Sequence, residues 1–169
     1  MFGLSTAERD AEFVRFATAA GGSLKRTAFL LTGDRELAAD LAQEALLRTY
    51  LAWRRVRPAE ATAYARRIVV NLTIDRWRRR EAMVGGIPEG VDPRDGHGRV
   101  DDHDQVVRML ASLPPQQRRV IVLRYYNDLP EAEVAECLGV SAGAVKSAAS
   151  RGLAALRNAY APTDERGER

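Results

Sequence analysis

The 169-residue chain has a single cysteine, which excludes an internal disulfide bond. A lone thiol fits the reducing interior of a cell. No apolar run approaches the ~20 residues that a membrane-spanning helix needs. The N-terminus also lacks the basic-then-apolar order of a secretory signal. We therefore expect a soluble, cytoplasmic protein with no direct membrane insertion.

Residues suited to catalysis or metal binding are also scarce. The two histidines, His97 and His103, lie in or beside a segment without regular periodicity. Cys137 falls within an expected helix, where a small buried apolar role is more common than a nucleophilic one. The sequence has no glycine-rich phosphate loop after a strand and no metal-ligand spacing. It predicts no enzyme activity, no cofactor, no metal site and no small-molecule substrate.

Charge and glycine are distributed unevenly, and this divides the chain. The segment 81–104 holds five glycines, two prolines and seven acidic residues against two arginines, although the whole chain has a net charge of +3. Apolar periodicity fails there, which indicates a flexible acidic linker. An ordered surface loop is the alternative. The expected domains are residues 1–80 and 105–160, followed by a disordered tail at 161–169.

Both domains show helical periodicity and no useful β alternation, so the fold class is all-α, with two small helical domains. In the first domain, two early helical segments are expected, loosened at Gly21-Gly22. Gly33 then ends one helix and Asp34 caps the next. Further helices are expected at 36–55 and 61–80, and in the second domain at 105–112, 115–126, 131–138 and 142–160.

The stretch 129–160 is typical of a helix-turn-helix. Gly139 supplies the turn between two helices with apolar inner faces, and Ser141 can cap the second helix. No acidic residue occurs from 141 to 160. The outer face of the second helix carries Lys146, Ser147, Ser150, Arg151 and Arg157. Such a face suits the DNA major groove; the alternative is a helical hairpin with a solvated basic face.

The helix expected at 61–80 has six arginines and one acidic residue, Asp75, with Tyr64 and Trp77 among them. Arginines neutralise phosphates, and aromatic rings stack on unpaired bases. Nucleic-acid contact is therefore expected, the alternative being a solubilising helix terminus. Tyr64 could equally lie in the core, because Ile68 and Leu72 share its side.

The helix that starts near Glu36 carries a mixed surface stripe opposite its apolar face. Asp40, Gln43, Glu44 and Leu47 recur at helical spacing, with Leu51 beyond them. Two leucines that continue a polar stripe suggest a partner helix, although a solvated face with scattered apolar residues is the alternative.

Several motifs, in their order along the chain, carry a family resemblance. In the first domain they are Leu31-Thr32-Gly33-Asp34, Ala39-Asp40-Leu41-Ala42-Gln43-Glu44, and Asn71-Leu72 followed by Asp75 and the arginine run. In the second they are Leu113-Pro114-Pro115-Gln116-Gln117-Arg118, Leu123-Arg124-Tyr125-Tyr126, Val145-Lys146-Ser147 and Ser150-Arg151-Gly152-Leu153. With the linker between them, these motifs resemble the extracytoplasmic-function sigma factors of bacterial RNA polymerase, and most of all the SigE-like actinobacterial family.

The resemblance implies a division of labour. The first domain would be sigma region 2, whose stripe of Asp40, Gln43, Glu44 and Leu47 grips the β′ clamp of core RNA polymerase. The following segment would recognise and melt the −10 promoter element, through Tyr64, Arg66, Arg67, Asn71, Arg76, Trp77, Arg78, Arg79 and Arg80. The second domain would be region 4, which meets the β flap. It would read the −35 element with Ser141, Lys146, Ser147, Ser150 and Arg151. An anti-sigma protein is a further candidate partner.

One departure from the family concerns the second helix of the helix-turn-helix. Relatives commonly carry arginine at the position of Ala148, so a phosphate or base contact is expected to be missing here. Two other functions compete with a sigma factor: a stand-alone helix-turn-helix regulator, and a protein adaptor that binds no DNA. The regulator would leave both the stripe on the 36–55 helix and the arginine-aromatic helix without a role, and the adaptor would make the basic faces incidental.

Overall fold

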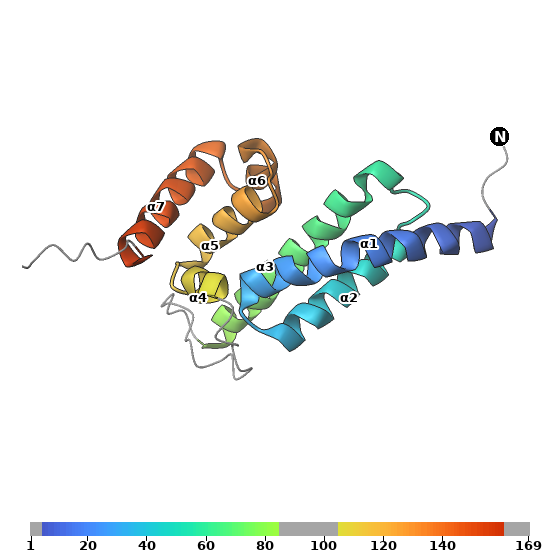
Figure 1. Cartoon of the computed structure of the whole chain (residues 1–169), viewed down its shortest axis with the longest axis horizontal. Helices are drawn as coiled ribbons and strands as arrows, with labels where there is room; N and C mark the ends of the chain where they lie inside the picture. The colour runs from blue at the N-terminus through green and yellow to red at the C-terminus, as the bar shows by residue number, and fades with distance from the viewer. Residues whose placement is uncertain (1–4, 85–104, 161–169) are drawn as a thin grey trace, which may run out of the picture.

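The computed structural model describes residues 5–84 and 105–160, and within these ranges every regular element is helical. The first domain contains α1 (Thr6–Thr32), α2 (Arg35–Leu51), the short 3-10 helix η1 (Pro58–Glu60) and α3 (Ala61–Val84). The second contains α4 (Gln105–Ala111), α5 (Pro115–Ile121), the π-helical turn η2 (Val122–Tyr126), α6 (Glu131–Leu138) and α7 (Ala142–Tyr160). In Figure 1 the two groups lie next to each other, with α4 and α5 near the ends of α1 and α3.

The helix boundaries follow from local chemistry. A capping box begins α1: Ser5 Oγ accepts from the Glu8 N–H at 3.3 Å, and Glu8 accepts from the Ser5 N–H at 2.7 Å. Gly33, in the left-handed region at φ 72°, ends this helix. Asp34 Oδ1 then accepts from the Leu37 N–H at 2.9 Å and begins α2. The stop at Gly33 and the start at Asp34 were both expected from the sequence.

Three expectations about the first domain are wrong in detail. The helix does not part at Gly21-Gly22, because α1 runs unbroken through both residues; packing of its later turns against α2 and α3 outweighs the helix cost of two glycines. Helix α2 ends at Leu51 rather than near 55, because the chain turns there and buries Trp53 against Phe13 and Phe16. Helix α3 continues to Val84, past the expected boundary at 80.

A continuous cluster of buried apolar side chains extends through both domains. In the first it includes Leu24, Leu41 and Val69, and in the second Val120 and Val134. The two described ranges thus share a core, which the sequence did not predict. The expected acidic linker at 85–104 and tail at 161–169 lie outside the described residues.

Candidate nucleic-acid and polymerase interface

The helix-turn-helix forms as the sequence predicts. Helix α6 ends at Gly139, in the left-handed region at φ 65°, and the Ala144 N–H donates to Ser141 Oγ at 3.1 Å at the start of α7. Gly152 lets α7 approach α5 closely, since a Cβ there would lie 3.1 Å from Ile121 Cγ1. The expected contact residues Lys146, Ser147, Ser150 and Arg151 are all exposed on α7. The turn and the cap therefore present a basic, hydroxyl-bearing helix face to solvent.

The expectation about position 148 needs correction. Ala148 is 1% exposed and faces the interior of the second domain, together with Val145 and Ala149. A side chain at this position does not lie on the outer face of α7 in this structure. The absence of an arginine at 148 therefore removes no surface contact from the helix as it is packed here.

Helix α3 separates an apolar side from a basic side. Ala65, Val69 and Val70 are fully buried against the first domain. Tyr64 is 38% exposed, which argues against the alternative that it lies in the core. The other residues assigned to the −10 element differ in exposure. Five of them are exposed: Asn71, Arg76, Arg78, Arg79 and Arg80. Arg66 and Trp77 are half-buried, and Arg67 is exposed and forms an ion pair with Glu136.

The stripe on α2 is solvent-facing. Asp40 and Gln43 are exposed, Leu47 is 52% exposed, and Glu44 forms an ion pair with Arg48 at 2.6 Å. Leu51 extends the stripe and is 75% exposed. An apolar surface of this kind at the end of a helix suits contact with another protein.

Sequence reasoning missed Tyr50 and Val14, two exposed residues near the same end of the bundle. Tyr50 is 42% exposed, donates from its hydroxyl to Asp10 at 2.9 Å, and packs on Phe13 with ring centroids 4.9 Å apart. Val14, on α1, is 60% exposed. The available signal in the sequence was that both residues lie within one turn of an aromatic residue, Val14 beside Phe13 and Tyr50 near Trp53. Helical periodicity alone did not distinguish either residue from a core residue.

The two domains meet along a seam that the sequence did not predict. Arg67 on α3 forms an ion pair with Glu136 on α6 at 3.0 Å. The guanidinium of Arg119 on α5 stacks on Trp77 of α3, 4.7 Å from the ring centroid. Asn127 donates from its side-chain amide to Thr27 Oγ1 at 3.0 Å. Two residues expected to contact DNA, Arg67 and Trp77, therefore contact the second domain in this structure.

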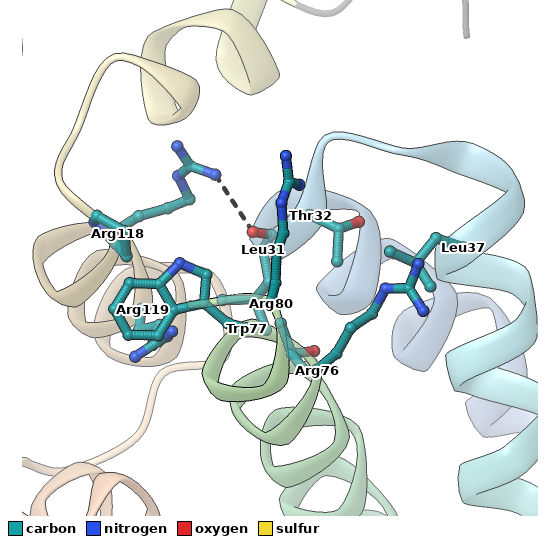
Figure 2. A pocket seen from close by; sticks show the side chains of 10 residues that line it. Leu31, Thr32, Leu37, Arg76, Trp77, Arg80, Arg118 and Arg119 are labelled. Atoms are coloured by element: carbon teal, nitrogen blue, oxygen red, sulfur yellow. Dashed lines mark hydrogen bonds between the residues drawn. The ribbon is translucent and has the colours of Figure 1, made fainter. Parts of the chain in front are cut away.

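Arg118 is the buried centre of this seam. Its guanidinium donates to four main-chain oxygens: those of Leu110 at 2.7 Å, Ala111 at 2.8 Å, Leu31 at 3.3 Å and Leu113 at 3.4 Å. Figure 2 shows its bond to Leu31, at the end of α1. Burial, followed by the nearby charge of Arg119, lowers the pKa of Arg118 to about 10. The side chain therefore remains charged at neutral pH while it ties α4, α5 and α1 together.

Within residues 5–84 and 105–160, no group of three or more histidine, cysteine or acidic side chains is placed to hold a metal ion. Over the same ranges, no helix is both long enough and apolar enough to cross a membrane.

The geometry defines a class: an all-helical protein of two small domains, each with a basic helix at its surface. Family models agree with this division, because residues 17–83 match sigma-70 region 2 and residues 103–156 match sigma-70 region 4. The RNA polymerase sigma-E factor of Streptomyces coelicolor is 36% identical over 159 residues, which cover 90% of this chain and 88% of that protein. The extracytoplasmic-function sigma factor SigW of Bacillus subtilis is 32% identical, covering 76% of this chain and 78% of that protein.

Solved structures show the same fold. The sigma factor RpoE from Bartonella quintana, in complex with the anti-sigma factor NepR, superposes with a TM-score of 0.68 at 22% identity, covering 86% of this chain and 94% of that one. CnrH, in complex with the cytosolic domain of CnrY, superposes with a TM-score of 0.60 at 22% identity, covering 87% of this chain and 86% of that one. The chain belongs to the extracytoplasmic-function sigma factors, the promoter-specificity subunits that act with core RNA polymerase on promoter DNA.

Proposed function

We propose that the two domains divide the work of promoter recognition in the way that the surfaces suggest. The exposed stripe of Asp40, Gln43, Glu44 and Leu47 on α2 binds the clamp of the β′ subunit. The basic side of α3 recognises and melts the −10 element, and the outer face of α7 reads the −35 element. One observation carries this proposal: each of the three surfaces is solvent-facing on a helix whose opposite side is buried in the core.

Within α3, Tyr64 is the proposed platform for an unpaired base. Its ring is partly exposed on the side of the helix that also carries Asn71. An aromatic face stacks on any base, and this interaction is worth ~1–3 kcal/mol per base in single-stranded complexes. The arginines at the other end of α3 supply phosphate contacts, which fix the position of the DNA without reading its sequence.

The protein has no catalytic step of its own in this proposal and acts in the cytoplasm, where core polymerase and DNA are found. An anti-sigma protein is a further proposed partner. The support for it is the fold shared with the sigma factor RpoE, which was solved in complex with the anti-sigma factor NepR.

The clamp assignment is tested by Gln43→Ala combined with Leu47→Ala. Both side chains are exposed, so the helical content and the free energy of unfolding should change little. Binding to core polymerase should weaken by roughly tenfold, since a central interface contact typically contributes more than ~1 kcal/mol. The measurement is a titration of labelled sigma factor with purified core polymerase, followed by run-off transcription.

A matched control variant also loses one amide and one apolar side chain, at positions outside the α2 stripe. Asn71→Ala combined with Met83→Ala deletes an exposed amide and an exposed apolar side chain on α3, a helix to which no polymerase contact is assigned. This variant should bind core polymerase much as the wild type does. Equal loss in both variants, or no loss in either, would contradict the placement of the clamp contact on α2.

A further inference from the structure

The seam engages one of the three surfaces that the proposed function assigns to partners. On α3, Arg67 pairs with Glu136 of α6 at 3.0 Å, and the guanidinium of Arg119 from α5 lies 4.7 Å from the centroid of the Trp77 ring (Figure 2). The residues that α7 offers to the −35 element are exposed, and the α2 stripe is solvent-facing. The second domain therefore contacts the helix assigned to the −10 element and leaves the other two surfaces accessible.

Buried groups hold the seam together in addition to these two contacts. Arg118 is 4% exposed, and its guanidinium donates to the Leu31 carbonyl at the end of α1 at 3.3 Å. The side-chain amide of Asn127 donates at 3.0 Å to the hydroxyl of Thr27, a residue that is 1% exposed. Apolar side chains of both domains also belong to one buried cluster. Separation of the domains would expose part of this apolar surface to water, which favours the contact.

The second domain offers α3 the same kinds of group that DNA would offer. The carboxylate of Glu136 forms a charge-assisted hydrogen bond with Arg67, as a phosphate oxygen would. The planar guanidinium of Arg119 lies over the Trp77 ring, and an unpaired base stacks on the same kind of surface. DNA that uses these two side chains must therefore displace the second domain from both of them.

We propose that the second domain competes with −10 DNA for α3 within the same chain, so that the seam must open before α3 engages the promoter. This inference rests on the proposed function, which assigns Arg67 and Trp77 to the −10 element. The apparent affinity for single-stranded DNA is then the intrinsic affinity multiplied by the fraction of molecules whose seam is open. A change that weakens the seam raises this affinity without adding any contact to DNA. Binding to duplex DNA through α7 needs no opening.

The test measures binding of the full chain to a fluorescent single strand of mixed sequence, at fixed salt concentration, for two variants of the second domain. Glu136→Gln and Arg119→Gln each remove a seam contact, and they change the net charge in opposite directions. Charge alone predicts that Arg119→Gln weakens binding to any DNA. The proposal predicts that each variant tightens single-strand binding by roughly threefold, as expected for surface contacts of this kind. The double variant should gain roughly tenfold, because the two contacts lie about 15 Å apart along α3 and should be independent.

Two controls separate opening of the seam from a general effect of charge. Glu133→Gln removes an exposed carboxylate from the same helix, but not the one bonded to Arg67, and should leave single-strand binding close to that of the wild type. A duplex of the same sequence should not bind more tightly to Arg119→Gln. The proposal is overturned if Arg119→Gln leaves single-strand binding unchanged or weaker. It is also overturned if Glu133→Gln gains as much as Glu136→Gln.

A further variant distinguishes failure of this inference from failure of the proposed function. Arg78→Ala combined with Arg79→Ala, made in the wild-type and Glu136→Gln proteins, removes two exposed arginines of α3 and leaves the Arg67 and Trp77 contacts in place. Weaker single-strand binding here, without a gain in the seam variants, would reject competition by the second domain and keep α3 as the DNA-binding helix. Unchanged binding here would reject the role of α3, and the inference would fall with it.

Discussion

At the scale of single residues, the main question about DNA sequence specificity concerns the side chains on the outer face of α7. Lys146 and Ser147 are exposed near the start of the helix, where recognition helices usually meet base edges. Arg151 lies one turn further along, with its Nε bonded to the Ser147 carbonyl at 3.4 Å. Ala148 is buried, so the outer face has one basic residue in each of two successive turns. In the proposed function the −35 contacts therefore depend on few side chains, and the −10 contacts should contribute a large share of promoter affinity.

Replacing Lys146 with alanine separates base reading from phosphate contact. If the ammonium group reads a base edge, Lys146→Ala should cost ~1–3 kcal/mol on the preferred −35 sequence and relax the preference at one or two positions. The measurement is a selection over randomised −35 sequences with holoenzyme containing the wild-type or variant protein. An identical consensus from both proteins would remove Lys146 from the residues that read bases.

The burial of Arg118 is a residue-scale feature that could not be predicted from the sequence. In the sequence it is one of two adjacent arginines in a family motif, and nothing in periodicity distinguishes it from Arg119. The structure buries Arg118 and leaves Arg119 half-buried over Trp77. Three of the carbonyls that Arg118 contacts lie five to eight residues away, and that of Leu31 lies 87 residues away. A periodic pattern within α5 encodes none of these contacts.

At the scale of elements, local chemistry predicted the helices of the second domain closely. Gly139 and Ser141 fix the turn between α6 and α7, and the prolines before α5 fix its start, so these boundaries depend on neighbours in sequence. The errors fell in α1, α2 and α3, and tertiary packing explains those in α1 and α2. Gly21-Gly22 stays helical because later turns of α1 are buried, and α2 stops early because Trp53 turns into an aromatic cluster.

The unbroken α1 gives a prediction about stability. Gly22 is exposed and helical, and a Cβ there would meet no atom within 4 Å. Gly22→Ala should therefore raise the free energy of unfolding by about 0.5–1 kcal/mol, since alanine restricts the unfolded chain and favours the helix. Urea denaturation followed by circular dichroism measures the change.

A second glycine provides the opposite control. Gly33 also has open space around it, but its φ of 72° is unfavourable for a residue with a Cβ. Gly33→Ala should lower the free energy of unfolding by about 1–2 kcal/mol. If both substitutions destabilised the protein alike, the helix at Gly22 would be held under strain, and packing would not be the reason that it stays unbroken.

At the scale of the whole molecule, the seam determines which surfaces are available together. The α2 stripe lies away from the seam residues in sequence and stays exposed, whereas Arg67 and Trp77 are engaged by the second domain. We call the arrangement in which the second domain contacts α3 closed. In the proposed function, core polymerase can therefore bind the α2 stripe while the protein is still closed. The sequence predicted two domains and their surfaces, but not their contact, because contacts between segments that are distant in sequence leave no periodic signal.

Opening of the seam can be followed through its own tryptophan. The chain has two tryptophans, so a Trp53→Phe background leaves Trp77 as the reporter. Glu136→Lys, which replaces attraction to Arg67 by repulsion, should destabilise the closed arrangement by about 1 kcal/mol and shift the Trp77 emission to longer wavelength. The measurement is steady-state fluorescence at low salt, where exposed ion pairs contribute most.

The matched control reverses a neighbouring charge. Glu133 is an exposed carboxylate one turn earlier on α6, and the carboxylate bonded to Arg67 is that of Glu136. Glu133→Lys should leave the Trp77 emission close to that of the background. An equal shift in both variants would show that net charge on α6 controls the emission, and the ion pair would have no special part in closure.

The stacking of Arg119 on Trp77 has a consequence for natural selection on these two residues. Trp77 meets the second domain when the protein is closed and, in the proposed function, meets DNA when it is open. Selection on Trp77 therefore acts through both contacts, whereas selection on Arg119 acts through its contact with Trp77 in the closed arrangement. A genetic screen for alleles that activate transcription without the normal stimulus should return changes at Arg119 and Glu136. Both residues lie in the domain that the proposed function assigns to the −35 element, and suppressors of such alleles should map to α3.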